Sequence, residues 1–162
     1  MEKPPALSVK MDNANVIGIC GYHKSGKTTL IVNLIQRLRK EGYRVATIKS
    51  ISEEFSIDRE GKDTWRHADA GADAVVAASV NETAFILKHG MEIEKIVEIL
   101  NRTVKPDLIL VEGKKDERWI PKIAVGEIDL EDAFRYDDNL DEVIEWIKTT
   151  LKPFSDISSP SH

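Results

Sequence analysis

The stretch from Gly21 to Thr28, which reads GYHKSGKT, constrains this chain more than any other feature. It matches the pattern G-x-x-x-x-G-K-S/T at every fixed position. A continuous apolar run over residues 16–20 precedes it, and apolar residues with helical spacing over 27–41 follow it. In such a strand–loop–helix arrangement the glycines let backbone N–H groups turn toward a phosphate, and the helix directs its positive N-terminal end at the same anion. We therefore call residues 21–28 the phosphate-binding loop.

Individual residues of the phosphate-binding loop have distinct expected roles. Lys27 is expected to reach the β- and γ-phosphates of a nucleotide as a point charge, and the Thr28 hydroxyl to bind Mg²⁺. His23 is expected to be a surface residue of the loop rather than a base. The alternative is a glycine-rich turn that matches the pattern by chance. The predicted nucleotide contacts are Gly21, Tyr22, His23, Lys24, Ser25, Gly26, Lys27, Thr28 and Thr29.

A carboxylate for the metal is predicted at Glu112. This residue ends the buried run Leu108–Val111, and Gly113 after it permits a sharp exit from the strand. Ligands of parallel sheets bind beyond the carboxyl ends of the strands, so we expect Glu112 to face the phosphate-binding loop and to hold the metal together with Thr28. The alternative is an ordinary acid at the end of a strand. Asp107 begins the same strand, and we expect a turn or cap residue there.

The whole chain alternates between short apolar runs and stretches with helical spacing. This order predicts an α/β fold of the P-loop NTPase type, with a mostly parallel sheet, helices on both faces and an added hairpin around Asn81-Glu82. We expect a flexible arm over 1–14, one nucleotide-binding domain over 15–151 and a flexible tail over 152–162. The expected strands are 16–20, 43–49, 74–78, 84–87, 108–111 and 122–125, and the expected helices are 27–41, 63–70 with Asp63 as N-cap, 91–103 and one around 140–147.

Composition excludes several classes of protein. The net charge of −5 argues against binding of nucleic acid through a strong basic field. The single cysteine, Cys20, excludes a disulfide within the chain and fits the cytoplasm. No apolar run approaches the ~18 residues of a membrane span, and the residues after Met1 lack the apolar core of a signal peptide. We therefore expect a cytoplasmic protein with neither a nucleic acid nor a membrane as partner.

A second polar segment, residues 58–67, reads DREGKDTWRH. Its cations can converge on an anion, and its two aspartates can orient those cations or join the outer shell of the metal. The alternative is a solvated loop followed by an amphipathic helix. The residues that we single out as ligand contacts are Asp58, Arg59, Lys62 and Arg66.

Taken together, these stretches resemble the MobB family, the B proteins of molybdopterin-guanine dinucleotide biosynthesis. The resemblance is carried by the phosphate-binding loop, Thr47-Ile48-Lys49, the Gly61-Lys62-Asp63-Thr64 segment, Ala70-Gly71-Ala72 and Val111-Glu112-Gly113. It extends over about residues 16–150, nearly the whole predicted domain. The phosphate-binding loop alone is unspecific, whereas its combination with the Gly61–Thr64 segment is much more telling.

The resemblance implies GTP and Mg²⁺ as cofactors, weak GTPase activity and a homodimer. It also implies an accessory role in molybdenum cofactor synthesis, in which GTP or molybdopterin is positioned for a MobA-like nucleotidyltransferase. Lys27 and Glu112 then become the catalytic residues, and Asp58–Arg66 a contact for the nucleotide or the pterin phosphate. The alternatives are a small-molecule kinase or a nucleotide-driven ligase on the same fold, and a protein that binds sulfate or phosphate without a nucleotide.

The sequence departs from the family pattern at two places. Histidines often follow the Ile-Lys strand end in the family, whereas this chain has Ser50-Ile51-Ser52-Glu53-Glu54 there. The family's Glu-Gly-Phe-Lys stretch appears here as Glu112-Gly113-Lys114-Lys115. The second change points to a different partner surface.

Overall fold

A computed structural model describes residues 15–151, so the arm predicted over 1–14 and the tail predicted over 152–162 lie outside the described residues. The chain divides into two compact units. Unit 1 contains the described residues up to Ser50 and those from Leu100 onward, and unit 2 contains Ile51–Ile99. Among the residues from 15 to 151, no helix is both long and apolar enough to cross a membrane.

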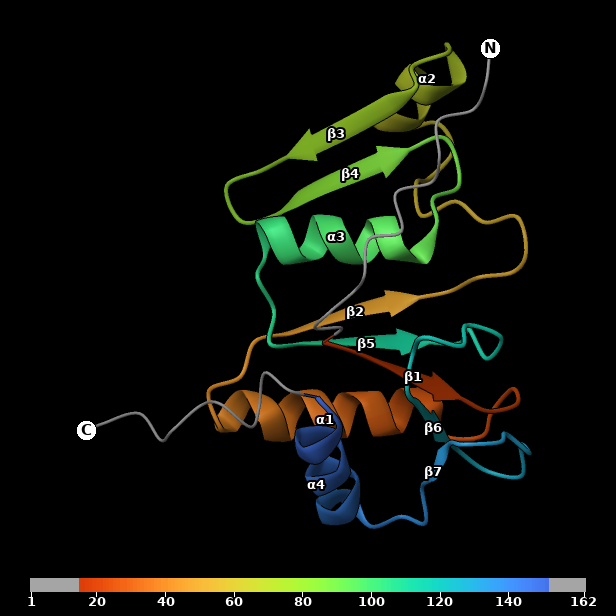
Figure 1. Ribbon diagram of the computed structural model, residues 1–162. Helices are drawn as coiled ribbons and strands as arrows, with labels where there is room; N and C mark the ends of the chain where they lie inside the picture. Colours follow the sequence, from red (N-terminus) through yellow and green to blue (C-terminus); the bar gives the residue numbers. More distant parts are fainter. Residues whose placement is uncertain (1–14, 152–162) are drawn as a thin grey trace, which may run out of the picture. The chain divides into compact units, whose positions relative to one another are not determined.

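Unit 1 is built on a five-stranded sheet with the order β2-β5-β1-β6-β7 (Figure 1). All four neighbouring pairs are parallel, which confirms the predicted parallel sheet. The central strands β1 and β5 are continuous apolar runs because both of their faces are buried. The strands are β1 (Val16–Cys20), β2 (Val45–Lys49), β5 (Leu108–Glu112), β6 (Lys122–Ala124) and β7 (Phe134–Arg135).

Two helices cover one face of this sheet. α1 (Lys27–Lys40) and α4 (Leu140–Thr150) pack on the same hydrophobic core (Figure 1). α1 ends where Gly42 takes a φ of 91°, as expected for a glycine just beyond a helix. α4 begins with the side chain of Asn139 accepting a hydrogen bond from the backbone N–H of Glu142. Residues of this core that are fully buried include Ile17, Ile19, Leu34, Leu110 and Ile147.

Irregular segments lie against part of the opposite face of the sheet. A crossover over residues 113–121 connects β5 to β6, and Ile120 within it approaches β1 closely. A Cβ atom at Gly18 would lie 3.3 Å from the Ile120 Cγ2 atom, so glycine leaves room for the crossover. After β6, Ile128 packs with Cys20 in a small second cluster. The close approach of Ile120 to Gly18 therefore fixes the path of the crossover between β5 and β6.

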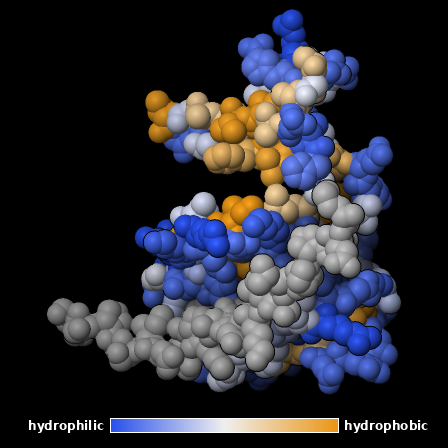
Figure 2. Space-filling view, turned by 45° about the horizontal axis from the view of Figure 1, so that its top comes forward, coloured by the Kyte–Doolittle hydropathy of each residue, from blue (hydrophilic) through white to orange (hydrophobic). Residues whose placement is uncertain are grey.

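Unit 2 contains a short helix and a hairpin. α2 (Asp63–Asp69) precedes the antiparallel strands β3 (Ala74–Ala78) and β4 (Thr83–Leu87), which confirms the predicted hairpin. α3 (Ile93–Thr103) crosses the boundary between the units. Hydrophobic side chains gather over the hairpin in Figure 2, on a face where Val76 is 51% exposed and Phe85 is 73% exposed.

Two local predictions differ from the structure. Asp63 is the first residue of α2 rather than its N-cap, which is Lys62. The carboxylate still lies in the first turn, where it interacts favourably with the helix dipole. The two-residue strand β7 was not predicted, because so short a segment carries no alternating pattern.

Candidate functional site

The phosphate-binding loop leaves β1 at its carboxyl end and makes a turn that requires glycine at its first position. A Cβ atom at Gly21 would lie 2.4 Å from the Ser25 Oγ atom and 2.6 Å from the Val125 carbonyl oxygen. Any other residue would therefore displace the loop. At its far end Gly26 has a φ of 99°, a conformation that favours glycine, and α1 begins at the next residue.

The Lys27 amine is held by the beginning of the same loop. Its Nζ atom donates hydrogen bonds to the Gly21 carbonyl at 2.9 Å and to the Tyr22 carbonyl at 2.6 Å. An ammonium group has three N–H donors, so one donor remains for an anion in the loop. The lysine is thus fixed in place before a ligand arrives.

The N-terminus of α1 offers further donors to the same space. The N-cap residue of α1 is Gly26, which has no side chain to accept a hydrogen bond from the first turn, and this turn contains no acidic residue. The backbone N–H groups of Lys27, Thr28 and Thr29 have no acceptor within the helix, because the first intrahelical bond runs from the Leu30 N–H to the Gly26 carbonyl. Together with the Lys27 amine, these free donors suit a phosphate chain.

A carboxylate and a second lysine face this loop from two neighbouring strands. Glu112 and Lys49 occupy partner positions at the carboxyl ends of β5 and β2. Both side chains line one cavity of about 380 Å³ with residues 23–29. The structure thus brings Glu112 to the predicted place beside Lys27 and Thr28. Sequence reasoning quoted Lys49 only as part of a motif and did not assign it to the site.

Asp107, at the other end of β5, has the structural role that was predicted for it. Its Oδ2 atom accepts a hydrogen bond of 2.6 Å from the backbone N–H of Arg44. Its own N–H donates to the Arg44 carbonyl at 2.8 Å. Asp107 therefore fastens the start of β5 to the residue before β2, at the edge opposite to Glu112.

A supporting contact behind the phosphate-binding loop was also missed. Gly126 follows β6, and a Cβ atom there would come within 3.2 Å of the Ser25 Cβ atom. The Arg135 guanidinium holds this segment by donating to the carbonyls of Gly126 and Ile128. No sequence signal connects residues 25, 126 and 135, because the contact depends on β6 and β7 being neighbours.

The polar segment 58–66 belongs to unit 2. The Asp58 carboxylate accepts hydrogen bonds of 2.9 Å from the Arg59 N–H and from the Thr64 hydroxyl, and so orders the turn before α2. Its second oxygen is buried and has no hydrogen-bond partner among the described residues. Arg59, Lys62 and Arg66 are all exposed. Arg66 lines a shallow cavity of about 340 Å³ together with Asp63, His67 and Ala70.

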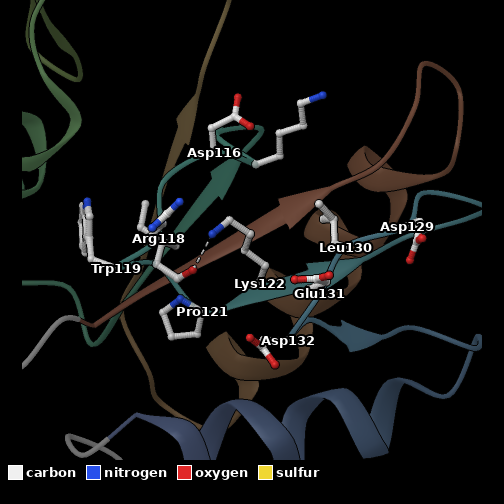
Figure 3. A pocket seen from close by; sticks show the side chains of 11 residues that line it. Asp116, Arg118, Trp119, Pro121, Lys122, Asp129, Leu130, Glu131 and Asp132 are labelled. Atoms are coloured by element: carbon white, nitrogen blue, oxygen red, sulfur yellow. Dashed lines mark hydrogen bonds between the residues drawn. The ribbon is translucent and has the colours of Figure 1, made fainter.

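A larger cavity of about 890 Å³ lies elsewhere in unit 1, between the crossover and residues 129–132 (Figure 3). The Lys122 amine extends into this region and donates to the Ile120 carbonyl at 3.0 Å. Both cations and carboxylates line the cavity, and none of the lining residues belongs to a helix. The phosphate-binding loop therefore offers a stronger anion site, although its cavity is smaller.

Comparison with known families gives one match over most of the chain. Residues 16–149 match the family model of MobB, described as molybdopterin guanine dinucleotide synthesis protein B. The Haemophilus influenzae molybdopterin-guanine dinucleotide biosynthesis adapter protein is 39% identical over 112 residues, which cover 68% of this chain and 62% of that protein. The Escherichia coli adapter protein is 34% identical over 113 residues, with 68% of this chain and 64% of that protein covered. The matches thus span less than two thirds of either relative.

Solved structures show the same fold. Bacillus subtilis MobB superposes with a TM-score of 0.65 at 20% identity, over 85% of this chain and 98% of that one. A crystal structure of molybdopterin-guanine biosynthesis protein B superposes with a TM-score of 0.55 at 25% identity, over 85% of this chain and 99% of that one. These likenesses confirm the predicted fold class.

Proposed function

This chain belongs to the MobB family, and on that premise we propose that it is an adapter protein of molybdopterin guanine dinucleotide synthesis that binds GTP with Mg²⁺. One observation carries the nucleotide part of the proposal. The free donors at the N-terminus of α1 and the fixed Lys27 amine face the same cavity as Glu112. Thr28 and Glu112 would hold Mg²⁺, which neutralises charge on the phosphates when bound.

The choice of GTP rests on the family rather than on a base-reading motif. The chain contains no Asn-Lys-x-Asp stretch of the kind that reads guanine in many GTPases. A thermal-shift series with GTP, GDP and ATP in the presence of Mg²⁺ tests the proposal, because a ligand that binds only the folded state raises the melting temperature. GTP and GDP should stabilise the protein more than ATP does.

Lys27→Ala is the variant that tests the phosphate-binding loop. It removes a side-chain charge that the carbonyls of Gly21 and Tyr22 hold, and we expect at least a tenfold loss of GTP affinity, or about 1.4 kcal/mol. Lys40→Ala, at the exposed end of α1, is the matched control. Equal affinities of the two variants by calorimetry would contradict the assignment.

We propose that GTP hydrolysis by the protein alone is slow, below about 1 s⁻¹. Rapid phosphoryl transfer needs a group that orients the attacking water and an additional cation, which is worth about 10³–10⁵ in rate. Arg59 and Arg66, which the sequence singled out as ligand contacts, are exposed residues of unit 2 and the candidates for that cation. Single-turnover assays with and without a MobA-like nucleotidyltransferase measure the rate. Transfer of the γ-phosphate to an acceptor would instead support a kinase.

We further propose that the cations of the 58–66 segment bind a phosphate-bearing ligand, for which molybdopterin is the family's candidate. Arg59, Lys62 and Arg66 are exposed and take part in no ion pair among the described residues. Replacing all three by alanine should weaken binding of the pterin phosphate or of GTP. Wild-type affinity of the triple variant for both ligands would leave the segment a solvated loop.

We propose that the protein forms a homodimer through the exposed face of the hairpin. A two-stranded sheet is marginally stable in water, and this one leaves Val76, Phe85 and Leu87 exposed on one face. A second copy of the chain would cover this face with the same apolar residues, as an isologous dimer requires. Sedimentation of the full chain at a series of concentrations tests the dimer.

A further inference from the structure

We propose that Lys49 binds the terminal phosphate of a nucleoside triphosphate in the phosphate-binding loop, so that the site distinguishes triphosphates from diphosphates. The proposal rests on the proposed function, because it needs a nucleotide in this loop. It assigns a direct ligand contact to a residue at the end of β2, two strands away from the loop's own strand.

The sheet places Lys49 at the site. β2 and β5 are parallel, and Lys49 and Glu112 are partners in their register. Glu112 is in turn the partner of Ile19 in β1, immediately before the residues that lead into the loop. The carboxyl ends of three neighbouring strands therefore meet at one edge, and both Lys49 and Glu112 line the cavity of residues 23–29.

Neither side chain of this register pair is used by the protein itself. Lys49 and Glu112 carry opposite charges on adjacent strands, yet they form no ion pair and their side chains make no hydrogen bond within the described residues 15–151. Adjacent opposite charges that stay unpaired in front of an anion site are available to a ligand that carries both signs. A metal-bound phosphate chain is such a ligand, since the carboxylate can take the metal side and the amine the phosphate oxygens.

The two lysines are placed to contact different phosphates of the nucleotide. The Lys27 amine is tied to the carbonyls of Gly21 and Tyr22, so it serves the phosphates that lie within the loop. Lys49 is separated from β1 by β5, so it lines the cavity on the far side of Glu112 from β1. A phosphate group that extends beyond the loop and past Glu112 is the terminal one of the nucleotide's phosphate chain. Lys49 therefore adds a contact that a triphosphate can make and a diphosphate cannot.

The test compares two ligands in one variant. Lys49→Met removes the charge and retains the length of an exposed side chain. We expect calorimetry with Mg²⁺ to show at least a tenfold loss of affinity for a non-hydrolysable GTP analogue and a change below twofold for GDP. Lys27→Ala should weaken both ligands. Lys49→Arg should restore most of the affinity for the analogue, because it retains the charge.

The controls separate the possible failures. Lys40→Met, on the exposed end of α1, should bind both ligands as the wild type does, and the melting temperature of ligand-free Lys49→Met should match the wild type. Equal losses for the two ligands, or no loss for either, would overturn the role of Lys49 while leaving the nucleotide site intact. A wild-type protein that binds neither ligand would overturn the proposed function and this inference with it.

Discussion

The two sheets of this protein bury their strands to very different degrees. In unit 1, residues 108–111 of β5 have no exposed surface, and every residue of β1 is buried. In unit 2, Val75 is the only buried residue of β3 and β4, and every second residue of the hairpin is exposed. Unit 1 thus encloses its own core, whereas the hairpin has one apolar face open to solvent.

The different burial of the two sheets indicates which properties of the protein each unit controls. A sheet that is buried on both faces supplies stability and fixes the positions of residues at the ends of its strands, as it does for Lys49 and Glu112. A hairpin with an open apolar face is suited to bind another surface. We therefore expect substitutions in unit 1 to change stability and ligand binding, and substitutions on the hairpin to change association.

The largest effect is expected from Leu110→Ala in the middle of β5. Leu110 is fully buried and belongs to the core beneath α1 and α4, so its truncation leaves a cavity and should lower the free energy of unfolding by about 2–5 kcal/mol. Urea denaturation measures the change. Leu87→Ala on the exposed face of β4 is the matched control, and its effect on a monomer should stay within about 0.5 kcal/mol. Similar losses in both variants would contradict the contrast between the units.

The sequence predicted unit 1 well because its elements carry strong local signals. Apolar runs over 16–20 and 108–111 marked β1 and β5, and the phosphate-binding loop fixed how α1 follows β1. The position of Glu112 followed from the rule that the carboxyl ends of parallel strands share one edge. The role of Asp107 followed from the same rule applied to the opposite end of its strand.

The parts that the sequence did not predict depend on contacts between distant segments. Lys49 lies in a motif, but its place beside Glu112 requires the order β2-β5-β1, which the sequence does not state. The support of Ser25 by Gly126 and Arg135 requires β6 and β7 to be neighbours. In unit 2 two short apolar runs on either side of Asn81-Glu82 indicated a hairpin, while the exposure of its apolar face became visible only in three dimensions.

The second largest effect is expected from Phe85→Ala on the hairpin. Phe85 is the partner of Val76 in the antiparallel register, and both are exposed on the apolar face. A central aromatic residue of an interface contributes about 2 kcal/mol or more to association, so the dissociation constant of the dimer should rise roughly 30-fold. Analytical ultracentrifugation measures it. If the variant remains as dimeric as the wild type, the dimer does not use this face.

A smaller effect is expected from Glu112→Gln, which tests whether unit 1 controls ligand binding. The amide retains the shape of the side chain and removes the charge that favours Mg²⁺. Nucleotide affinity in EDTA should be unchanged, and the additional affinity that Mg²⁺ confers should fall about tenfold, or about 1.4 kcal/mol. Calorimetry with and without the metal gives both values. A variant with the metal dependence of the wild type would make Glu112 an ordinary acid at the end of a strand.

The smallest effect is expected from Phe85→Ala on the labelling of Cys20, which reports on unit 1 alone. Cys20 is the single cysteine of the chain and lies buried at the end of β1, where its Sγ atom donates to the Gly113 carbonyl at 3.3 Å. Burial raises the pKa of the thiol, and the nearby charges of Lys122 and Lys27 only partly offset the rise. At neutral pH the native thiol is therefore protonated, and a thiol reagent reacts only after unit 1 opens.

This dependence separates the two units in one measurement. Leu110→Ala should accelerate Cys20 labelling strongly, because it raises the population of the opened unit 1. Phe85→Ala should change the rate by less than about twofold when both proteins are measured as monomers, since it removes an exposed side chain from unit 2.

The pKa of the Cys20 thiol is raised in the folded state. The stabilisation by the neutral thiol is therefore present at neutral pH, and it is lost as the pH rises from the ordinary thiol pKa through the raised one. Labelling is therefore compared at neutral pH, and acceleration by Phe85→Ala equal to that by Leu110→Ala would show that the hairpin and the parallel sheet open together.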